Sequence, residues 1–291
     1  MAASVRPRRS ALYMPGSNGR ALEKGRALAA DVLILDLEDA VADEAKDGAR
    51  QTIADALAEG GYGNREILLR TNGLTTPSGH GDLVFAASQP LHGVLLPKVE
   101  SGDIVRRAEA ILDEHGASSD MAIWCMIETP RGVLAAEEIA RSSPRLAGFV
   151  LGTNDLAKDL HCLHTPDRLP MVTALGLTIL AARAHGLALL DGVYADLNDL
   201  EGFEKSCVQG LEFGFDGKSL IHPKTLEIAN RVFSPAEEEI AWARKISAAF
   251  EEAKAEGKGV LQVDGKLVEA LHVSEAQRLI SLADQIAALE A

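Results

Sequence analysis

The sequence predicts an α/β protein with a (β/α)8 TIM-barrel fold over residues 1–235 and a C-terminal lid of helices and a hairpin over residues 236–291. The chain length of 291 residues suits one barrel of roughly 250 residues plus an extension. Hydrophobic residues make up 47% and charged residues 25% of the chain, the composition of a folded globular protein. Short apolar runs alternate with longer helical segments, as a barrel of parallel strands and connecting helices requires.

The predicted strands are continuous apolar runs, without the alternation of polar and apolar residues that marks a half-exposed strand. In chain order they are Ser10–Met14, Asp31–Leu37, Glu66–Thr71, Gly93–Val99, Met121–Ile127, Gly148–Gly152, Leu187–Gly192 and Gly214–Ile221. Eight repeats favour a closed barrel over a doubly wound open sheet, which has fewer strands and usually carries a glycine-rich dinucleotide fingerprint. We find no such fingerprint in the sequence.

The segments between these runs have helical character, and several stop at a glycine such as Gly116 or Gly186. Helices are predicted over Asn18–Ala30, Asp43–Ala58, Val105–His115, Leu134–Arg141 and Met171–His185. They supply the outer layer that a barrel needs.

The alternation of apolar runs and helical segments ends after Pro235. Ala236–Gly257 predicts a charged amphipathic helix, and Ser274–Leu289 predicts a last helix. Between them, two short strands flank Asp264-Gly265, a favoured hairpin turn pair. This segment is too small to hold a core alone, so we expect it to pack on the barrel or on a neighbouring subunit.

Charge and cysteine content narrow the class of partner. The formal net charge of −14 would repel nucleic acid and anionic membranes, so we expect neither as a partner. No apolar run approaches the roughly 20 residues that a membrane helix needs. The three cysteines stand at no paired spacing, which is typical of reduced thiols. We therefore expect a cytoplasmic protein.

Polar residues follow nearly every predicted strand, and the carboxyl ends of barrel strands meet at one mouth where active sites lie. They are Asp36, Glu38 and Asp39, then Arg70, Lys98, Glu128, Asn154-Asp155, Asp191 and His222. Glu128 and Asp155 come from adjacent strands, so both can reach one ion. Carboxylate oxygens suit a hard cation, so we expect Mg²⁺ there, with Mn²⁺ as the alternative. Arg70 offers a two-pronged donor for a substrate carboxylate.

A glycine-rich turn follows the first predicted strand, in the stretch PGSNGRALEKG. Backbone N–H groups there would suit a phosphate, and Arg20 and Lys24 would add positive charge. These residues favour a nucleotide-like ligand at this side of the mouth.

The motifs RSALYMPGSN, DVLILDLEDAV, LLRTNG, LLPKVE, MIETPRGV, LGTNDLAKDL, DGVY and GFDGKSLIHP make a specific set. Over essentially the whole chain, the sequence resembles the citrate lyase β-subunit-like, or HpcH/HpaI aldolase, family of CoA ester lyases. The resemblance implies a (β/α)8 barrel in homotrimers or homohexamers, with each C-terminal lid over a neighbouring active site. It also implies an acyl-CoA substrate and Mg²⁺ at Glu128 and Asp155.

The resemblance extends to further site residues. It implies that Arg70 binds the substrate carboxylate and that Glu38 lies near the water shell of the metal. We expect Arg70, Glu38 and Asp36 to be catalytic residues. The matching segments for CoA and substrate are the Tyr13–Asn18 turn, Arg20, Lys24, Gly152, Thr153, Asn154, Ile221 and Pro223.

One departure from the family pattern lies in the lid. Many family lyases carry an aspartate after the hairpin, whereas this chain has Glu269 at the end of Gly265-Lys266-Leu267-Val268-Glu269. We expect Glu269 to be catalytic, with one methylene more of reach. The segment DGKLVEALHV looks closer to a branch that includes malyl-CoA thioesterases.

The resemblance implies three functions. The primary expectation is a Mg²⁺-dependent lyase that cleaves a short 3-hydroxyacyl-CoA thioester of the malyl-CoA or citramalyl-CoA type to a 2-oxo acid and acetyl-CoA, with Glu269 protonating the enolate. The alternative is a (3S)-malyl-CoA thioesterase, in which Glu269 activates water. The third is a citrate lyase β-type subunit that acts on a citryl thioester held by an acyl carrier. Lyase and thioesterase need the same bound substrate, so both stay open.

Overall fold

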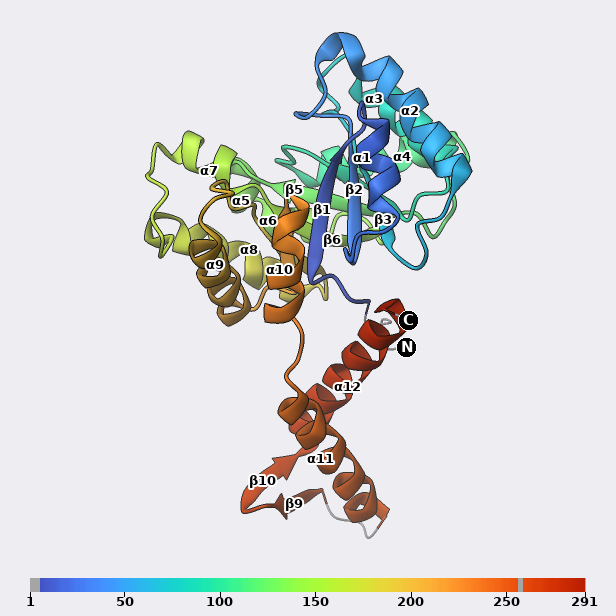
Figure 1. The fold of residues 1–291 in the computed structure, drawn as a ribbon. Coiled ribbons are helices and arrows are strands. Elements are labelled where there is room, and N and C mark those ends of the chain that lie inside the picture. The colour runs from blue at the N-terminus through green and yellow to red at the C-terminus, as the bar shows by residue number, and fades with distance from the viewer. Residues whose placement is uncertain (1–5, 256–258, 291) are drawn as a thin grey trace. The chain divides into compact units, whose positions relative to one another are not determined.

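The computed structural model describes residues 6–255 and 259–290, which belong to two compact units (Figure 1). Arg8–Phe233 form the first unit, and the residues from Ser234 onward belong to the second. Each unit is described by itself below.

Eight parallel strands close into a barrel in the order in which they occur in the sequence (Figure 1). They are β1 Ser10–Pro15, β2 Val32–Asp36, β3 Glu66–Arg70, β4 Gly93–Leu96, β5 Ala122–Ile127, β6 Leu146–Leu151, β7 Ala188–Asp191 and β8 Gly217–Leu220. Strand β1 also pairs with β8, which closes the ring. Each strand falls on one of the predicted apolar runs, so the predicted fold class is confirmed.

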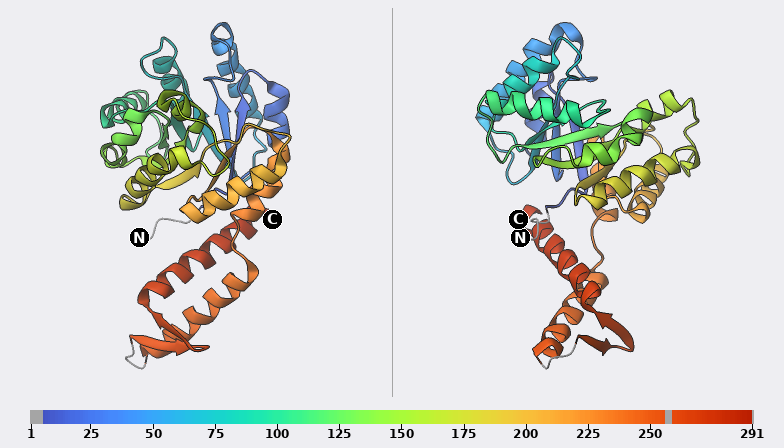
Figure 2. Two further views of the ribbon diagram at one scale, coloured as in Figure 1. Left: turned by 90° about the vertical axis from the view of Figure 1, so that its left-hand side faces the viewer. Right: turned by 180° about the vertical axis from the view of Figure 1, so that it is seen from behind.

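Helices surround the strands, as both views in Figure 2 show. They are α1 Gly19–Gly25, α2 Lys46–Glu59, α3 Gly79–Ala87, α4 Gly102–Glu114, α5 Pro130–Leu134, α6 Ala136–Ala140, α7 Thr153–Leu160, α8 Val172–Ala184, α9 Leu200–Phe213 and α10 Leu226–Val232. Short 3-10 turns cover Asp43–Ala45, Leu169–Met171 and Pro223–Thr225. Helices α3, α7, α9 and α10 lie outside the five segments singled out as helical, and α5 overlaps the predicted Leu134–Arg141 only at Leu134. The first predicted helix, Asn18–Ala30, is limited to Gly19–Gly25.

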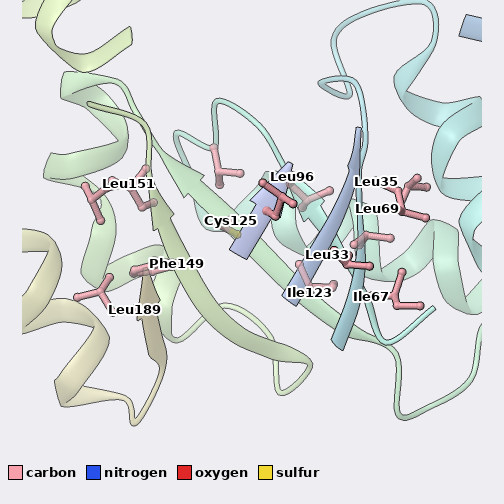
Figure 3. Packing of buried hydrophobic residues seen from close by; sticks show 14 of the residues in the cluster. Leu33, Leu35, Ile67, Leu69, Leu96, Ile123, Cys125, Phe149, Leu151 and Leu189 are labelled. Carbon is pink, nitrogen blue, oxygen red and sulfur yellow. The ribbon is translucent and has the colours of Figure 1, made fainter. Parts of the chain in front are cut away.

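Two apolar layers follow from the alternation of side chains along each strand. The layer inside the barrel consists of Ala11, Val32, Ile34, Leu68, Leu95, Trp124, Met126, Val150 and Leu190. The alternate residues pack under the helices in a larger cluster, and Figure 3 shows part of it, including Leu35, Leu69 and Leu151. The position of a residue in this alternation therefore decides whether its side chain faces the barrel interior or the helices.

A buried ion network lies on the helix side of β7 and β8. The Nζ of Lys218 and the Nη1 of Arg168 are each 2.6 Å from an oxygen of Asp191. Burial opposes the charge of Asp191, but Lys218 and Arg168 outweigh it and lower the pKa of this carboxyl. The expectation that Asp191 points into the barrel mouth is wrong, because it follows the inward-facing Leu190 and so points outward.

Asp191→Asn is expected to lower the free energy of unfolding by about 3–5 kcal/mol, because it leaves the buried charges of Lys218 and Arg168 uncompensated. A urea titration followed by circular dichroism measures the change. The matched control is Glu201→Gln, which removes an exposed i,i+4 pair with Lys205 on α9 and should cost less than about 0.5 kcal/mol. Equal urea midpoints for Asp191→Asn and the unchanged protein would contradict a stabilising role for the network.

The second unit contains α11 Glu237–Ala255, β9 Val260–Val263, β10 Lys266–Glu269 and α12 Ala270–Glu290. The strands form the predicted antiparallel hairpin, and Asp264 and Gly265 both take positive φ angles of 48° and 78°, as a two-residue hairpin turn requires. Helix α12 begins four residues before the predicted Ser274. Gly257, the predicted end of the preceding helix, lies outside the described residues.

This unit has an apolar cluster of its own, which we did not expect from its size. Helices α11 and α12 lie side by side, with the hairpin at one end (Figure 2). Their contact and the inner face of the hairpin bury Ala243, Ile246, Phe250, Val263, Val268, Val273 and Ala276. Within the described residues of both units, no helix is long and apolar enough to cross a membrane.

Candidate active site

Charged side chains gather at the rim of the barrel where β2, β3 and β5 end. Asp36 lies beside Arg70 in the register of β2 and β3. Both follow inward-facing residues, Ile34 and Leu68, by two positions, so both point toward the barrel axis. Glu128 follows the inward-facing Met126 in the same way. The three side chains therefore meet at one mouth, as predicted.

Arg70 is held on two sides by carboxylates. Its Nε and Nη2 each lie 2.6 Å from an oxygen of Asp36, and its Nη1 lies 2.9 Å from Oε2 of Glu38. The guanidinium carbon lies 4.7 Å from the ring centroid of Tyr13. Burial opposes the charge, but the hydrogen bond and the charge of Asp36 outweigh it and raise the pKa of Arg70. Arg70 is thus a permanently charged group in a fixed orientation.

Asp36 acts through other residues. Its side chain is fully buried, and its carboxylate also accepts hydrogen bonds from the backbone N–H groups of Glu38 and Ala40, at 2.9 and 3.1 Å. These contacts fix the loop after β2 and orient Arg70. In the described chain, the contacts of Asp36 are with Arg70 and with backbone N–H groups, and its catalytic role stays a prediction.

Tyr13 lies with this cluster. Its ring lies beside the guanidinium of Arg70, its hydroxyl lies 3.8 Å from the sulfur of Met126, and burial raises its pKa. We expected it with the exposed CoA turn, but the structure groups it with the carboxylates.

Lys98 links the remaining carboxylates. Its Nζ lies 2.7 Å from Oε1 of Glu38 and 3.6 Å from Oδ2 of Asp155, and its backbone N–H donates to Oε1 of Glu128 at 2.7 Å. Burial and the charge of Glu38 raise the pKa of Glu128 to about 7. Burial likewise raises the pKa of Glu38, against the charge of Arg70. From the sequence, Lys98 is expected at the barrel mouth, but no function is predicted for it.

Gly152 makes room for Glu128. The two residues follow Leu151 and Ile127, which lie beside each other in the register of β5 and β6. A Cβ on Gly152 would lie 2.3 Å from Oε2 of Glu128, so no larger residue fits there without a shift. Asp155 is in the first turn of α7, which begins at Thr153 directly after this glycine.

Thr153 and Asn154 have different environments. Thr153 is buried, and a Cβ on Gly192 would lie only 2.6 Å from its hydroxyl oxygen. Asn154 is exposed in the first turn of α7. Thr153 therefore packs β6 against the end of β7, and Asn154 is the one of the two with an accessible side chain.

The carboxylate cluster fits a divalent cation. Within residues 6–255 and 259–290, two positive groups, Arg70 and Lys98, contact the carboxylates Asp36, Glu38, Asp39, Glu128 and Asp155. Burial first, and then the charge of the neighbouring Glu38, raises the pKa of Glu128. In the described part of the chain, no group of three or more His, Cys, Asp or Glu side chains is arranged to hold a metal ion. Mg²⁺ usually keeps several waters and takes few protein carboxylates, so Glu128 and Asp155 as its ligands stay a prediction.

The segments expected to hold CoA lie side by side, because β1 pairs with β8. Gly16 is buried, and its N–H donates to the carbonyl of Asp36 at 2.9 Å. Arg20 and Lys24 are exposed one turn apart on α1, and Ile221 and Pro223 are exposed after β8. No ion pair of Arg20 or Lys24 is found within residues 6–255 and 259–290.

Lys224 is a further cation at this side of the mouth that we did not single out in the sequence. It follows Pro223, is exposed, and has no side-chain partner in the described chain. Its position directly after the eighth strand, in the stretch IHPKT, was the available signal.

Glu269 belongs to the second unit. It ends β10, is partly buried, and its backbone N–H donates to Nδ1 of His272 at 3.0 Å. His272 thus caps the start of α12 from its third position, as the returning side chain of a capping box does. The part of Glu269 in the chemistry at the barrel mouth stays a prediction.

Several known proteins resemble this chain over most of its length. A model of the family described as HpcH/HpaI aldolase/citrate lyase matches residues 9–223. The (3S)-malyl-CoA thioesterase of Cereibacter sphaeroides is 49% identical over 291 residues, which cover 100% of both chains. The L-malyl-CoA/beta-methylmalyl-CoA lyase of the same species is 34% identical, covering 98% of this chain and 97% of the lyase.

A solved structure shares the fold. The crystal structure of protein CitE from Mycobacterium tuberculosis in complex with magnesium, acetoacetate and coenzyme A superimposes with a TM-score of 0.74 at 28% identity. The match covers 94% of this chain and 97% of that chain.

Proposed function

This chain belongs to the HpcH/HpaI aldolase/citrate lyase family, and from that premise we propose that it is a Mg²⁺-dependent thioesterase acting on (3S)-malyl-CoA or a closely similar thioester. The observation that carries the proposal is the full-length similarity to a (3S)-malyl-CoA thioesterase at 49% identity. A cluster of buried carboxylates with Arg70 at its centre supports it, because a malyl group carries a carboxylate and a hydroxyl that such a site can bind.

Glu128 and Asp155 would hold the cation, with Mg²⁺ favoured over Mn²⁺ because a solved relative is a complex with magnesium. When bound, the ion supplies Lewis-acid polarisation of substrate oxygens. Arg70, oriented by Asp36, would pair through Nη1 with the malyl carboxylate in place of the exposed Asp39, whose oxygen is 3.5 Å away. Arg20 and Lys24 would pair with the phosphates of CoA.

We propose Glu269 as the general base for hydrolysis. Its carboxylate would take a proton from a water molecule while the water oxygen attacks the thioester carbonyl carbon. The C–S bond then breaks, and the CoA sulfur leaves as a thiolate that is protonated to the thiol. The products are the free hydroxy dicarboxylic acid and CoA.

Carbon–carbon cleavage is the second candidate, and the similarity to an L-malyl-CoA/beta-methylmalyl-CoA lyase favours it. The same contacts would bind the substrate. The hydroxyl proton would be removed, the C–C bond would break to glyoxylate and an acetyl-CoA enolate, and Glu269 would protonate that enolate. Citramalyl-CoA would give pyruvate in place of glyoxylate.

One assay separates the two reactions. The purified chain is incubated with Mg²⁺ and (3S)-malyl-CoA, and two products are followed in parallel. Free thiol without glyoxylate is the expected result and reports hydrolysis. Glyoxylate, trapped as a hydrazone, without free thiol would replace the thioesterase proposal by the lyase.

The same assay addresses the carrier-dependent alternative and assembly. Turnover of a free CoA thioester would dismiss a subunit that requires an acyl carrier. Assembly into a homotrimer or homohexamer, with the lid over a neighbouring site, stays a prediction. Light scattering measures the number of subunits.

A further inference from the structure

Lys98 has a backbone conformation that is unusual for its residue type. Its φ angle is 49°, in the left-handed region, and in the described chain only three other non-glycine residues have a positive φ. A lysine there is strained by its Cβ and gains no local hydrogen bond from its side chain, as asparagine or aspartate would. Such a conformation persists only where surrounding contacts impose it, and these contacts often belong to functional sites.

The contacts of the Lys98 backbone point to Glu128. The N–H of Lys98 donates to Oε1 of Glu128 at 2.7 Å, and the side chain of Glu128 is buried. A hydrogen bond from a backbone N–H to a buried carboxylate is charge-assisted and directional. Together with the space left by Gly152, it fixes one orientation of this carboxylate.

The contacts of the Lys98 side chain point to Glu38 and Asp155. The ammonium lies 2.7 Å from Oε1 of Glu38, whose other oxygen lies 2.9 Å from Nη1 of Arg70. Each oxygen of the Glu38 carboxylate therefore contacts a cation, one from the end of β3 and one from the loop after β4. The ammonium also lies 3.6 Å from Asp155, so its charge acts on both expected metal ligands.

We propose that Lys98 is a positioning residue of this site: its N–H orients Glu128, and its ammonium holds Glu38 beside the metal-ligand pair. This role deepens the proposed function and rests on it, because it takes Glu128 and Asp155 as the metal ligands. It has a consequence that a purely structural lysine would not have. Because the ammonium repels a second cation close by, Lys98 weakens metal binding while it improves turnover.

Lys98→Met and Lys98→Gly test the proposal, since both remove the ammonium and keep the N–H. By calorimetry, each variant should bind Mg²⁺ about tenfold tighter, because one repulsive charge is lost at short range. In the thioester assay, kcat should fall about 10- to 100-fold, in the range found for residues that orient metal ligands, with KM within about threefold. Metal affinity and turnover should thus move in opposite directions.

Thermal melting tests the strain at this position. Glycine takes a positive φ without a Cβ clash, so Lys98→Gly should melt about 2–4 °C above Lys98→Met. The matched control is Lys205→Met, which removes an exposed lysine that pairs with Glu201 on α9. Its Mg²⁺ affinity and kcat should stay within about twofold of the unchanged protein, because in the described chain its ammonium pairs with Glu201 and not with a residue of the barrel mouth.

Three results would overturn the proposal. Unchanged or weaker Mg²⁺ binding in Lys98→Met would remove the electrostatic role, and an unchanged kcat would remove the role of the ammonium in positioning Glu38. A protein that binds no Mg²⁺ at all would overturn it together with the metal site. If the unchanged protein turns over neither (3S)-malyl-CoA nor citramalyl-CoA, the proposed function fails. The Mg²⁺ titrations and melting curves still test the electrostatic role and the backbone strain of Lys98.

Discussion

Glu128→Gln is expected to lower kcat/KM for thioester turnover at least about 1,000-fold and to abolish Mg²⁺ binding in a calorimetric titration. The carboxamide has nearly the same shape, so it fits the space beside Gly152 without a clash. The carboxamide is neutral, however, and Mg²⁺ binding at a site with two protein carboxylates depends on the negative charge of each. Calorimetry and the two-product assay measure the two effects separately.

The control for this variant is Glu212→Gln, which makes the same chemical change at an exposed position of α9 and should leave both values unchanged. Asp155→Asn should match Glu128→Gln, and the double variant should be little worse than either, because the two residues act as a unit. Retained Mg²⁺ affinity in Glu128→Gln would place the metal elsewhere.

Glu269→Gln is expected to lower the rate of thioester hydrolysis about 100- to 10,000-fold while Mg²⁺ affinity stays unchanged. The amide cannot accept the proton of the attacking water, and Glu269 is not one of the two expected metal ligands, Glu128 and Asp155. Release of free thiol from (3S)-malyl-CoA measures the rate.

Two further variants sharpen this test. Glu252→Gln changes an exposed residue of α11 in the same unit and should have no effect. Glu269→Asp keeps a carboxylate and loses one methylene of reach, and a displacement of about 1 Å can cost about 100-fold in rate. Full hydrolysis by Glu269→Gln would exclude this residue as the base.

The strands could be predicted from the sequence because each is a continuous apolar run, and the site residues because they follow those runs. The apolar runs alone do not predict whether each side chain points into the barrel or toward the helices. Asp36, Arg70 and Glu128 are in phase with inward-facing residues, whereas Asp191 is one position out of phase and pairs with Lys218 under the helices. Counting every second residue along each strand from a known inward-facing position would have shown that Asp191 points outward and the other three residues inward.

Two of the helices that were not singled out, α3 and α9, have a local reason in common. Helix α3 contains Gly79 and Gly81, and α9 contains Gly202 and Gly210, residues that lower helix propensity. Gly210 is needed because a Cβ there would lie 2.9 Å from the carboxylate of Asp191. The role of Lys98 could not be predicted either, since it depends on a left-handed backbone that lysine rarely adopts.

The pairing of β1 with β8 has a consequence for how the protein is made. Ala11 finds its partner Ser219 only when nearly the entire barrel segment has left the ribosome. At about 5–20 residues per second, synthesis of the intervening chain takes on the order of 10–40 s. Throughout that interval one edge of β1 lacks its strand partner and exposes free backbone donors and acceptors beside apolar side chains. The nascent chain is then open to wrong pairing and to capture by chaperones, until its last barrel strand emerges.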